Sequence, residues 1–437
     1  MGLTIKWDST YMCNLNCKHC INGDYLGDIS NELNYEEFEN IIKDIKSKYE
    51  IDYIHMLGGE PTVKKDFLKI CKILDYNNID FGFNTNGILL HEKLIKELLR
   101  LKHLKSIVFS IEGHNATIND DIRGKKVFNR IISSINSTNK NKDLLKSNIN
   151  IEINFVISKK NYKYVSNMID LCINLKATKL NILAMIEEGN AKGSGYSVSF
   201  PEQVFAMKEI SKRYKSLGNK LIIDPKFTRP MAKNYMESVF GMVFPQSVHG
   251  CGAGLLFGFM DNKGRMFPCN RFKTNDLNLE KYSIRENKFK DVWSDEDFSV
   301  PFSIIESEEY RNLKPCKNCE YFSKTCFPCP LDVNKDTIIT ECSLYLNEIR
   351  KKNYNNIRPI NQDIRFVHKI DSILAISTKT LNTIKLNKNS YNILLNIMNR
   401  FINDYPSLKQ YSEKNNIEIN DLLKFIDYLE TKGFIEI

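Results

Sequence analysis

The stretch Cys13-Asn14-Leu15-Asn16-Cys17-Lys18-His19-Cys20 places three cysteines on one short loop, spaced C-x3-C-x2-C. Three thiolates this close together can hold three irons of a [4Fe–4S] cluster and leave the fourth iron without a protein ligand. Structural zinc sites usually have four protein ligands, so the triplet suits zinc less well. Buried thiols are the alternative, because cysteine is among the most buried residue types. The spacing favours an iron–sulfur site with one open iron.

Composition sets the broad class of the protein. The chain has 437 residues, which predicts two or three domains. No apolar run is long enough to cross a bilayer, and residues 1–10 lack a secretory signal, so we expect a cytoplasmic protein without a membrane partner. There the 12 cysteines favour metal ligation over disulfides, except Cys71 and Cys172, which lie in apolar helical patterns and are expected in the core. The net charge of +9 is spread along the chain and identifies no partner.

Strand-like and helix-like patterns alternate through residues 1–220. The predicted strands begin at Ile5 and lie at 53–57, 81–83, 104–110, 151–156 and 180–184. Repeated strand–helix units predict a parallel sheet with right-handed crossovers. Six units predict an α/β fold, a partial (β/α)6 TIM-like barrel rather than a closed barrel of eight. Chemistry in such folds gathers at the carboxyl ends of the strands, where the cysteine loop and several polar motifs follow.

Two smaller domains are predicted after the barrel. Residues 221–349 hold most of the remaining cysteines and a predicted hairpin, 256–260 with 265–267, and a domain with so few apolar runs commonly depends on metal. Residues 350–363 are polar and predict a linker at the start of the third domain, 350–437. Two strands, three helices and a last strand at 434–437 predict a small winged-helix-like α+β domain. Asn420 is the predicted N-cap of its third helix and Gly433 the stop.

The cysteine loop after the first strand resembles that of the radical S-adenosylmethionine (SAM) superfamily, and the resemblance covers about the first 220 residues. Three further motifs follow in the expected order. Gly58-Gly59-Glu60-Pro61 resembles the glycine-rich motif after the second strand. Asn84-Thr85-Asn86-Gly87 resembles the element after the third. Ser110-Ile111-Glu112-Gly113, followed by Arg123, resembles the ribose and carboxylate contacts.

The resemblance implies a role for each of these residues. Cys13, Cys17 and Cys20 would be catalytic as ligands of the SAM-binding [4Fe–4S] cluster. The residues expected to contact SAM are His19, Gly58, Gly59, Glu60, Asn86, Ser110 and Arg123. His19 stands where a larger aromatic is usual, and Glu112 replaces the usual aspartate. The implied reaction is reductive cleavage of SAM to a 5′-deoxyadenosyl radical, which removes a hydrogen atom from a substrate.

The later cysteines resemble the SPASM domain of peptide-modifying radical SAM enzymes, which carries two auxiliary [4Fe–4S] clusters, three clusters in all. The resemblance assigns Cys251, Cys269 and Cys329 to the nearer cluster, with an open position or His249 as a fourth ligand. It assigns Cys316, Cys319, Cys326 and Cys342 to the outer cluster, although Cys326 lies one residue away from the usual spacing. A zinc ribbon is the alternative, because Cys-x2-Cys pairs are a zinc signature.

The last domain resembles a RiPP recognition element, the winged helix that binds the leader of a ribosomally made precursor peptide as an added strand. Winged helices also bind DNA through a basic third helix. Here Lys424 and Lys432 are outnumbered by Asp421, Asp427 and Glu430, which disfavours nucleic acid. A purely structural cap is a further alternative.

These resemblances together imply a radical SAM/SPASM peptide maturase that forms a thioether, a carbon–carbon cross-link or an inverted residue in a precursor peptide. It would need a low-potential electron donor such as flavodoxin or ferredoxin. A formylglycine-generating enzyme of the anaerobic sulfatase-maturase type is the nearest alternative. Asn270 disfavours it, because those enzymes hold an aspartate base there and an amide cannot accept the proton. A zinc-ribbon, winged-helix nucleic-acid-binding protein is the alternative of another class.

Overall fold

The structure is a computed structural model. It describes residues 2–437 except 219, 227–229, 243–251, 275–279, 300–304, 306, 314–315, 320, 323, 325, 330–335, 361–363, 370–371 and 379. The chain forms two compact units. The first comprises residues 1–230, 242–311 and 327–331, and the second comprises residues 231–241, 312–326 and 332–437.

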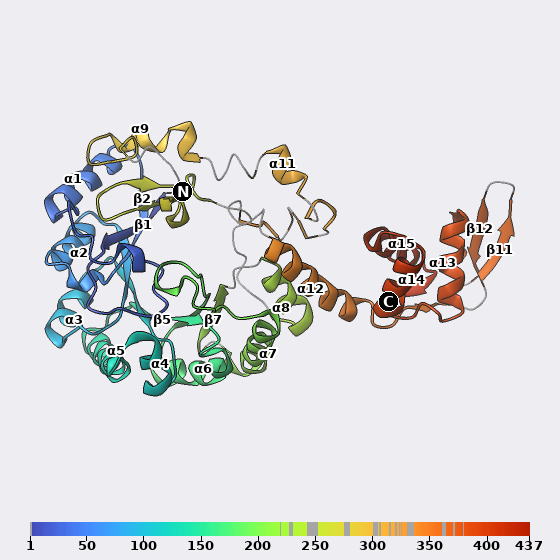
Figure 1. Cartoon of the computed structure of the whole chain (residues 1–437), viewed down its shortest axis with the longest axis horizontal. Coiled ribbons are helices and arrows are strands. Elements are labelled where there is room, and N and C mark those ends of the chain that lie inside the picture. Colours follow the sequence, from blue (N-terminus) through green and yellow to red (C-terminus); the bar gives the residue numbers. More distant parts are fainter. Residues whose placement is uncertain are drawn as a thin grey trace. The chain divides into compact units, whose positions relative to one another are not determined.

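The first unit is built around a nine-stranded sheet in the order β7-β6-β5-β4-β3-β2-β1-β8-β9. Its parallel strands are β1 (Leu3–Thr10), β2 (Ile51–Gly58), β3 (Asp80–Thr85), β4 (Leu104–Ser110), β5 (Asn150–Ile157), β6 (Lys179–Ala184), β7 (Ile222–Lys226) and β8 (Phe257–Met260), and β9 (Met266–Phe267) is antiparallel to β8. The intervening helices are α1 (Tyr35–Lys46), α2 (Phe67–Tyr76), α3 (Glu92–Leu99), α4 (Ala116–Arg123), α5 (Val127–Leu145), α6 (Val165–Asn174) and α7 (Phe200–Leu217). Figure 1 shows these helices arranged around the outside of the strands. Six strand–helix units followed by β7 confirm the predicted partial TIM-like barrel.

The apolar pattern of each unit explains this packing. In α1, Phe38, Ile41, Ile42 and Ile45 recur at helical spacing and are all buried. The Trp7 ring of β1 stacks on Phe38, with centroids 4.3 Å apart. Odd-numbered residues of β1 therefore face the helices, and its even-numbered residues face the inside of the barrel. Cys71 and Cys172 are fully buried, which confirms their predicted place in the core.

Two strands extend the barrel beyond the predicted region. Strand β7 pairs in parallel with β6. The sequence does not predict it, because this five-residue strand contains Pro225 and buries only Ile223. The predicted hairpin is confirmed as β8 and β9, and its first strand joins the other edge of the sheet by pairing in parallel with β1. The long-range pairing of β8 with β1 brings residues near 260 to the start of the chain.

The first unit also contains two short helices, α9 (Phe289–Trp293) and α11 (Glu308–Arg311). In the second unit, α8 (Pro230–Phe240) packs on α12 (Asp336–Asn353) through the rings of Tyr235 and Tyr345, whose centroids lie 5.2 Å apart. The predicted linker at 350–363 is wrong. Its first residues complete α12, and β10 (Arg358–Pro359) pairs with β14 (Ile435–Glu436). Tyr354 and Ile357 are buried in the core there. These two apolar side chains hold the otherwise polar segment against the rest of the unit.

The carboxyl-terminal part of the second unit has the predicted α+β composition. Strands β11 (Ile364–His368), β12 (Ile373–Ser377) and β13 (Thr383–Leu386) form an antiparallel sheet, and the helices are α13 (Lys388–Met398), α14 (Tyr405–Lys414) and α15 (Ile419–Thr431). Leu422, Leu423, Ile426 and Leu429 place α15 in the core as predicted. Its N-cap is Glu418 rather than Asn420, whose side chain instead accepts a hydrogen bond from Arg350. Gly433 has φ +70° and ends the helix as predicted.

Candidate active site

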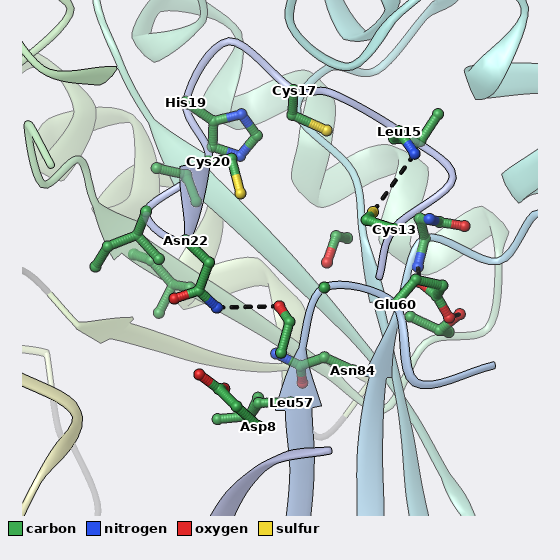
Figure 2. Close-up of a pocket in the computed structure, with 18 of the residues that line it drawn as sticks. Asp8, Cys13, Leu15, Cys17, His19, Cys20, Asn22, Leu57, Glu60 and Asn84 are labelled. Carbon is green, nitrogen blue, oxygen red and sulfur yellow. Dashed lines mark hydrogen bonds between the residues drawn. The ribbon is translucent and has the colours of Figure 1, made fainter. Parts of the chain in front are cut away.

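One cavity of about 420 Å³ lies at the carboxyl ends of the first strands. Its walls include all ten residues predicted for the first cluster and SAM, namely Cys13, Cys17, His19, Cys20, Gly58, Gly59, Glu60, Asn86, Ser110 and Arg123. Figure 2 shows the cysteine loop arching over this space, with His19 and Cys20 on one side and Cys13 and Glu60 on the other. Residues from four strand ends therefore meet in one place, as the parallel topology requires.

Two glycines allow the cysteine loop to approach the end of β2. The Gly59 N–H donates to Thr10 O over 2.7 Å, and the Glu60 N–H donates to Met12 O over 2.9 Å. A Cβ at Gly58 would lie 2.2 Å from Thr10 O, and one at Gly59 would lie 2.3 Å from Met12 O. Gly58 also has φ +122°, a conformation that side chains disfavour. The glycine pair is therefore a steric requirement for seating the loop.

The Glu60 carboxylate is engaged by the protein on both oxygens. Oε1 accepts from the hydroxyls of Thr62 (2.5 Å) and Thr85 (2.7 Å), and Oε2 accepts from the Asn86 N–H (2.6 Å). Burial raises the pKa of Glu60, while these hydrogen bonds act in the opposite direction. The carboxylate ties the end of β2 to the end of β3, and it thereby positions Asn86. Its predicted contact with SAM stays a prediction.

Glu112 organises the opposite wall. Its Oε1 lies 2.9 Å from Arg123 Nη1 and 3.2 Å from His19 Nε2, and its Oε2 accepts from the Val156 N–H over 2.7 Å. Burial alone would raise the pKa of Glu112, but His19 and Arg123 hold it below its usual range. The replacement of aspartate by Glu112 thus keeps a carboxylate that orients two predicted SAM contacts.

Two nitrogen atoms of this wall are buried without a hydrogen-bond partner in the described structure. They are Arg123 Nε and His19 Nδ1. Arg123 is the last residue of α4, and its side chain is more than nine-tenths buried. Buried polar groups are normally satisfied, so unpartnered polar atoms of residues that line a cavity favour the binding of a polar ligand there. A guanidinium suits a carboxylate or another anion.

The three thiols of the loop share the cavity wall. The Leu15 N–H donates to Cys13 Sγ over 3.4 Å (Figure 2). Burial raises the pKa of Cys13 to about 11 and also raises the pKa values of Cys17 and Cys20. Within the described part of the chain, no three His, Cys, Asp or Glu side chains are already grouped as a metal-binding cage. The three cysteines line one cavity without forming a ready-made cage, and their role as cluster ligands stays a prediction.

The cavity also includes residues that sequence reasoning did not select. Asp8 on β1, Asn84 on β3 and Lys226 on β7 line it, together with Asn22, whose Nδ2 donates to Gly58 O over 3.1 Å. Asp8 and Asn84 lie near the ends of predicted strands, a signal that could have found them. Lys226 could not be found, because β7 was not predicted. Asn270 lines the same cavity. It occupies the position at which sulfatase-maturing enzymes hold an aspartate base.

The later cysteines divide between the two compact units. Cys269 and Cys329 belong to the first unit, where Arg271 Nη1 lies 3.5 Å from Cys329 Sγ. Cys316, Cys319, Cys326 and Cys342 belong to the second. Burial raises the pKa of Cys326, and the other three thiolates of that group raise it further. The partition of these cysteines between two clusters stays a prediction. Cys251 and His249 lie outside the described residues.

Comparison with known proteins identifies similar chains. Residues 7–171 match the family model of the radical SAM superfamily. An AdoMet-dependent heme synthase of Methanosarcina barkeri is 26% identical over 332 residues, 74% of this chain and 90% of that protein. Mycofactocin maturase MftC of Mycolicibacterium smegmatis is 22% identical over 323 residues, 73% of this chain and 76% of that protein.

Two solved structures share the fold. Streptococcus suis SuiB bound to S-adenosylmethionine superposes with a TM-score of 0.58 at 17% identity, covering 74% of this chain and 72% of that one. The protein anSMEcpe with bound AdoMet superposes with a TM-score of 0.59 at 17% identity, covering 80% and 92%. No helix among the described residues is both long and apolar enough to span a bilayer.

Proposed function

Residues 7–171 form a radical SAM domain, and from this premise we propose that the enzyme cleaves SAM reductively and modifies a ribosomally made precursor peptide with the 5′-deoxyadenosyl radical. One observation carries the first half of the proposal. Three cysteines and seven predicted SAM contacts, dispersed between residues 13 and 123, line a single cavity. The second half is supported by the similarity to mycofactocin maturase MftC and by the shared fold with SuiB, which has also been solved bound to the precursor peptide SuiA.

The residues present fit the implied cofactors. Cys13, Cys17 and Cys20 would hold a [4Fe–4S] cluster, which when bound supplies the electron that cleaves SAM. Arg123 offers a buried, unpartnered Nε–H to the SAM carboxylate, and Glu112 holds the guanidinium in place. Gly58 and Gly59 let the backbone come close to the ligand, because they carry no side chain. Asn86 and Ser110 place polar side chains on the same wall.

The later cysteines would bind two auxiliary clusters, one in each compact unit. Cys269 and Cys329 would bind the nearer cluster with Cys251, and Cys316, Cys319, Cys326 and Cys342 would bind the outer one. Such clusters suit the acceptance of an electron from a modified peptide or the binding of a thiolate. A flavodoxin or ferredoxin would supply the low-potential electron. We place the reaction in the cytoplasm, where thiols stay reduced.

The leader of the precursor peptide would bind the β11-β12-β13 sheet. In the described residues β11 and β13 are the outer strands of this sheet, and each pairs on one side only. An outer strand offers unpaired backbone groups to an extended peptide, which is a common mode of recognition. The radical SAM domain and the acidic character of α15, where Lys424 lies 3.3 Å from Asp421, favour this role over nucleic-acid binding.

Two other reactions compete with this proposal. Formylglycine formation is disfavoured because Asn270, on the cavity wall, cannot accept a proton. A reaction like that of the heme synthases is favoured by the 26% identity to the Methanosarcina barkeri protein. A precursor peptide and a tetrapyrrole are the two substrate classes to be distinguished. Mass spectrometry shows which of them the enzyme changes.

The test is anaerobic purification and cluster reconstitution, followed by addition of SAM and dithionite. The expected product is 5′-deoxyadenosine, detected by mass spectrometry. The triple variant Cys13→Ala, Cys17→Ala, Cys20→Ala should produce none, while Cys71→Ala, a core cysteine outside the cavity, should retain the reaction. Absence of 5′-deoxyadenosine from the reconstituted wild-type enzyme would refute the proposal.

The peptide is tested by co-expression with the short open reading frame nearest to the gene. A mass change, or an altered stereocentre after hydrolysis when the mass is unchanged, is expected only with the active enzyme. An unmodified peptide together with a converted tetrapyrrole would instead assign the heme-type reaction.

A further inference from the structure

The inside of the partial barrel is polar at mid-height. On β2 and β3, His55 Nε2 lies 2.8 Å from Asn84 Oδ1, and on β2 and β4 the Tyr53 hydroxyl lies 3.0 Å from Ser106 Oγ. Closed barrels of this type fill the same layer with bulky branched side chains. A polar layer next to the candidate active site is therefore suited to contact with a polar ligand rather than to packing.

Two lysines belong to this inner face. Lys6 faces inward on β1, between the two neighbouring strands. It is in register with His55 on β2 and with Phe259 on β8. Lys226, at the end of β7, lines the same cavity as Asp8 and Phe259. Phe259, the register partner of Lys6, lines the cavity to which Lys226 also belongs, so the two lysines flank the same space although their strands are far apart in the sheet order.

Lys6 lies in a part of the inner face of the barrel that is open to solvent. Lys6 is solvent-exposed although its neighbours Ile5 and Trp7 are buried, and its Nζ lies 5.1 Å from the centre of the Phe257 ring. Enclosure by protein lowers the pKa of Lys6, and the Lys226 ammonium lowers it further, partly offset by Cys269. Lys6 is therefore accessible from the space beside the cavity, because its register partner Phe259 lines that cavity.

The carboxylates near this pair have other partners as well, and Lys226 shares Asp224 with Lys179. Asp224 Oδ2 lies 3.5 Å from Lys226 but only 2.8 Å from Lys179, which is its closer partner. Glu152 accepts a hydrogen bond from Asn181. Within the described residues, no carboxylate lies within ion-pair distance of Lys6. Burial lowers the pKa of His55, so this side chain is neutral at physiological pH and adds no positive charge.

We propose that Lys6 and Lys226 bind a carboxylate of the substrate inside the barrel, beside the cavity assigned to SAM. The inference rests on the proposed peptide-modifying function and narrows its substrate to peptides that present an anionic group to the barrel. Two ammonium groups facing one hollow gain a shared counter-ion when such a group enters. The carboxylate belongs either to an acidic side chain or to the peptide's carboxyl terminus.

The test uses three acetylated pentapeptides of the pattern glycine-glycine-X-glycine-glycine. The first has X as glutamate and an amidated terminus, the second has glutamine and a free terminal carboxylate, and the third has glutamine and an amidated terminus. Binding to the reconstituted full chain with SAM is measured by calorimetry. We expect one of the two carboxylate peptides to bind at least about fivefold more tightly than the neutral one, the increment of a single charged hydrogen bond. The one that does so identifies the source of the carboxylate.

Variants then locate the binding group. Lys6→Met and Lys226→Met keep the aliphatic stem, and each should reduce the preference for the carboxylate, while the double variant should abolish it. Lys43→Met is the matched control, because Lys43 is an exposed residue of α1 paired with Glu39 and should leave the preference intact. Equal affinity for the three peptides, no binding of any at millimolar concentration, or a preference that survives the double variant would each overturn the inference.

A second measurement needs no substitution. Reductive methylation followed by mass spectrometry should modify Lys6 and Lys226 more slowly in the presence of the preferred peptide, with Lys43 unchanged. Equal rates at all three lysines would contradict the inference. Formation of 5′-deoxyadenosine by the same wild-type preparation keeps the two proposals distinguishable. If SAM is cleaved but the peptides bind equally, only the inference about the carboxylate fails.

Discussion

Arg123 Nη1 lies 2.9 Å from Glu112 Oε1, and both side chains are more than nine-tenths buried. The pair joins the end of α4 to the turn after β4, and the same carboxylate oxygen also lies 3.2 Å from His19. Two predicted SAM contacts from different parts of the chain therefore depend on one acidic side chain.

Glu112→Ala should be strongly destabilising, because it leaves the Arg123 guanidinium buried without its partner. The expected loss is about 3–5 kcal/mol of unfolding free energy, typical of breaking a buried ion pair. SAM binding should weaken as well. Asp121→Asn is the control, because its ion pair with Lys18 is solvent-exposed and is worth about 0–1 kcal/mol. Chemical denaturation measures both, and a similar small loss in the two variants would contradict the positioning role of Glu112.

Gly59→Ala should displace the cysteine loop, because the new methyl group would lie 2.3 Å from Met12 O. Overpacking of this kind costs about 1–3 kcal/mol, and SAM binding should fall about tenfold or more. Gly195→Ala provides the control, because Gly195 has φ +64° but nothing within 4 Å of its added Cβ. That variant should lose only the cost of the backbone conformation, about 1–2 kcal/mol, and keep its SAM affinity. Calorimetric titration with SAM distinguishes the two outcomes.

Glu60→Gln should loosen the connection between β2 and β3. An amide keeps one acceptor oxygen but turns an NH2 group toward the donors of Asn86 or Thr85. The expected loss is about 1–3 kcal/mol, with faster hydrogen exchange at the Asn86 amide. Glu97→Gln, at a partly exposed pair with Lys72, should leave both quantities nearly unchanged. Unaltered exchange at Asn86 in Glu60→Gln would argue against this role.

His55 should make stability depend on pH. Burial lowers its pKa in the folded state below 6.5, so the unfolded chain binds the proton more readily. The folded protein is therefore at full stability above pH 6.5 and loses stability as the pH falls below that value, until the folded-state pKa is reached. His55→Gln should remove this component. Urea denaturation at a series of pH values tests it, and an identical pH dependence in both proteins would show that His55 contributes nothing.

Cys326→Ser should remove the outer auxiliary cluster alone. Iron content is expected to fall by about four atoms per chain, because a [4Fe–4S] cluster normally needs its complete set of thiolates. Cys13, Cys17 and Cys20, the proposed ligands of the SAM-binding cluster, belong to the other compact unit, so formation of 5′-deoxyadenosine should persist. Cys172→Ala is the control and should keep all of the iron, because Cys172 is buried in the core. Zinc in place of iron in the wild-type protein would contradict this assignment.

Most of the barrel could be predicted from its sequence. The buried faces of α1 and β1, the positions of β2 to β6 and the hairpin of β8 and β9 follow from local apolar periodicity, which short windows of sequence contain. Strand β7 escaped prediction because it is only five residues long, includes a proline and buries only Ile223. The predicted linker failed because Tyr354 and Ile357 pack against residues far along the chain, and a polar composition does not reveal such contacts.

The sequence by itself determined which chemical groups the protein has and the order in which they occur, because the cysteine spacing and the glycine pair are local patterns. Only the tertiary structure decided which of them meet. The pairing of Glu112 with both Arg123 and His19 and the hydrogen bonds that Glu60 accepts from Thr85 and Asn86 all join residues distant in sequence. The physical reason is that the curvature of the parallel sheet sets these distances, and no short stretch of the chain encodes it.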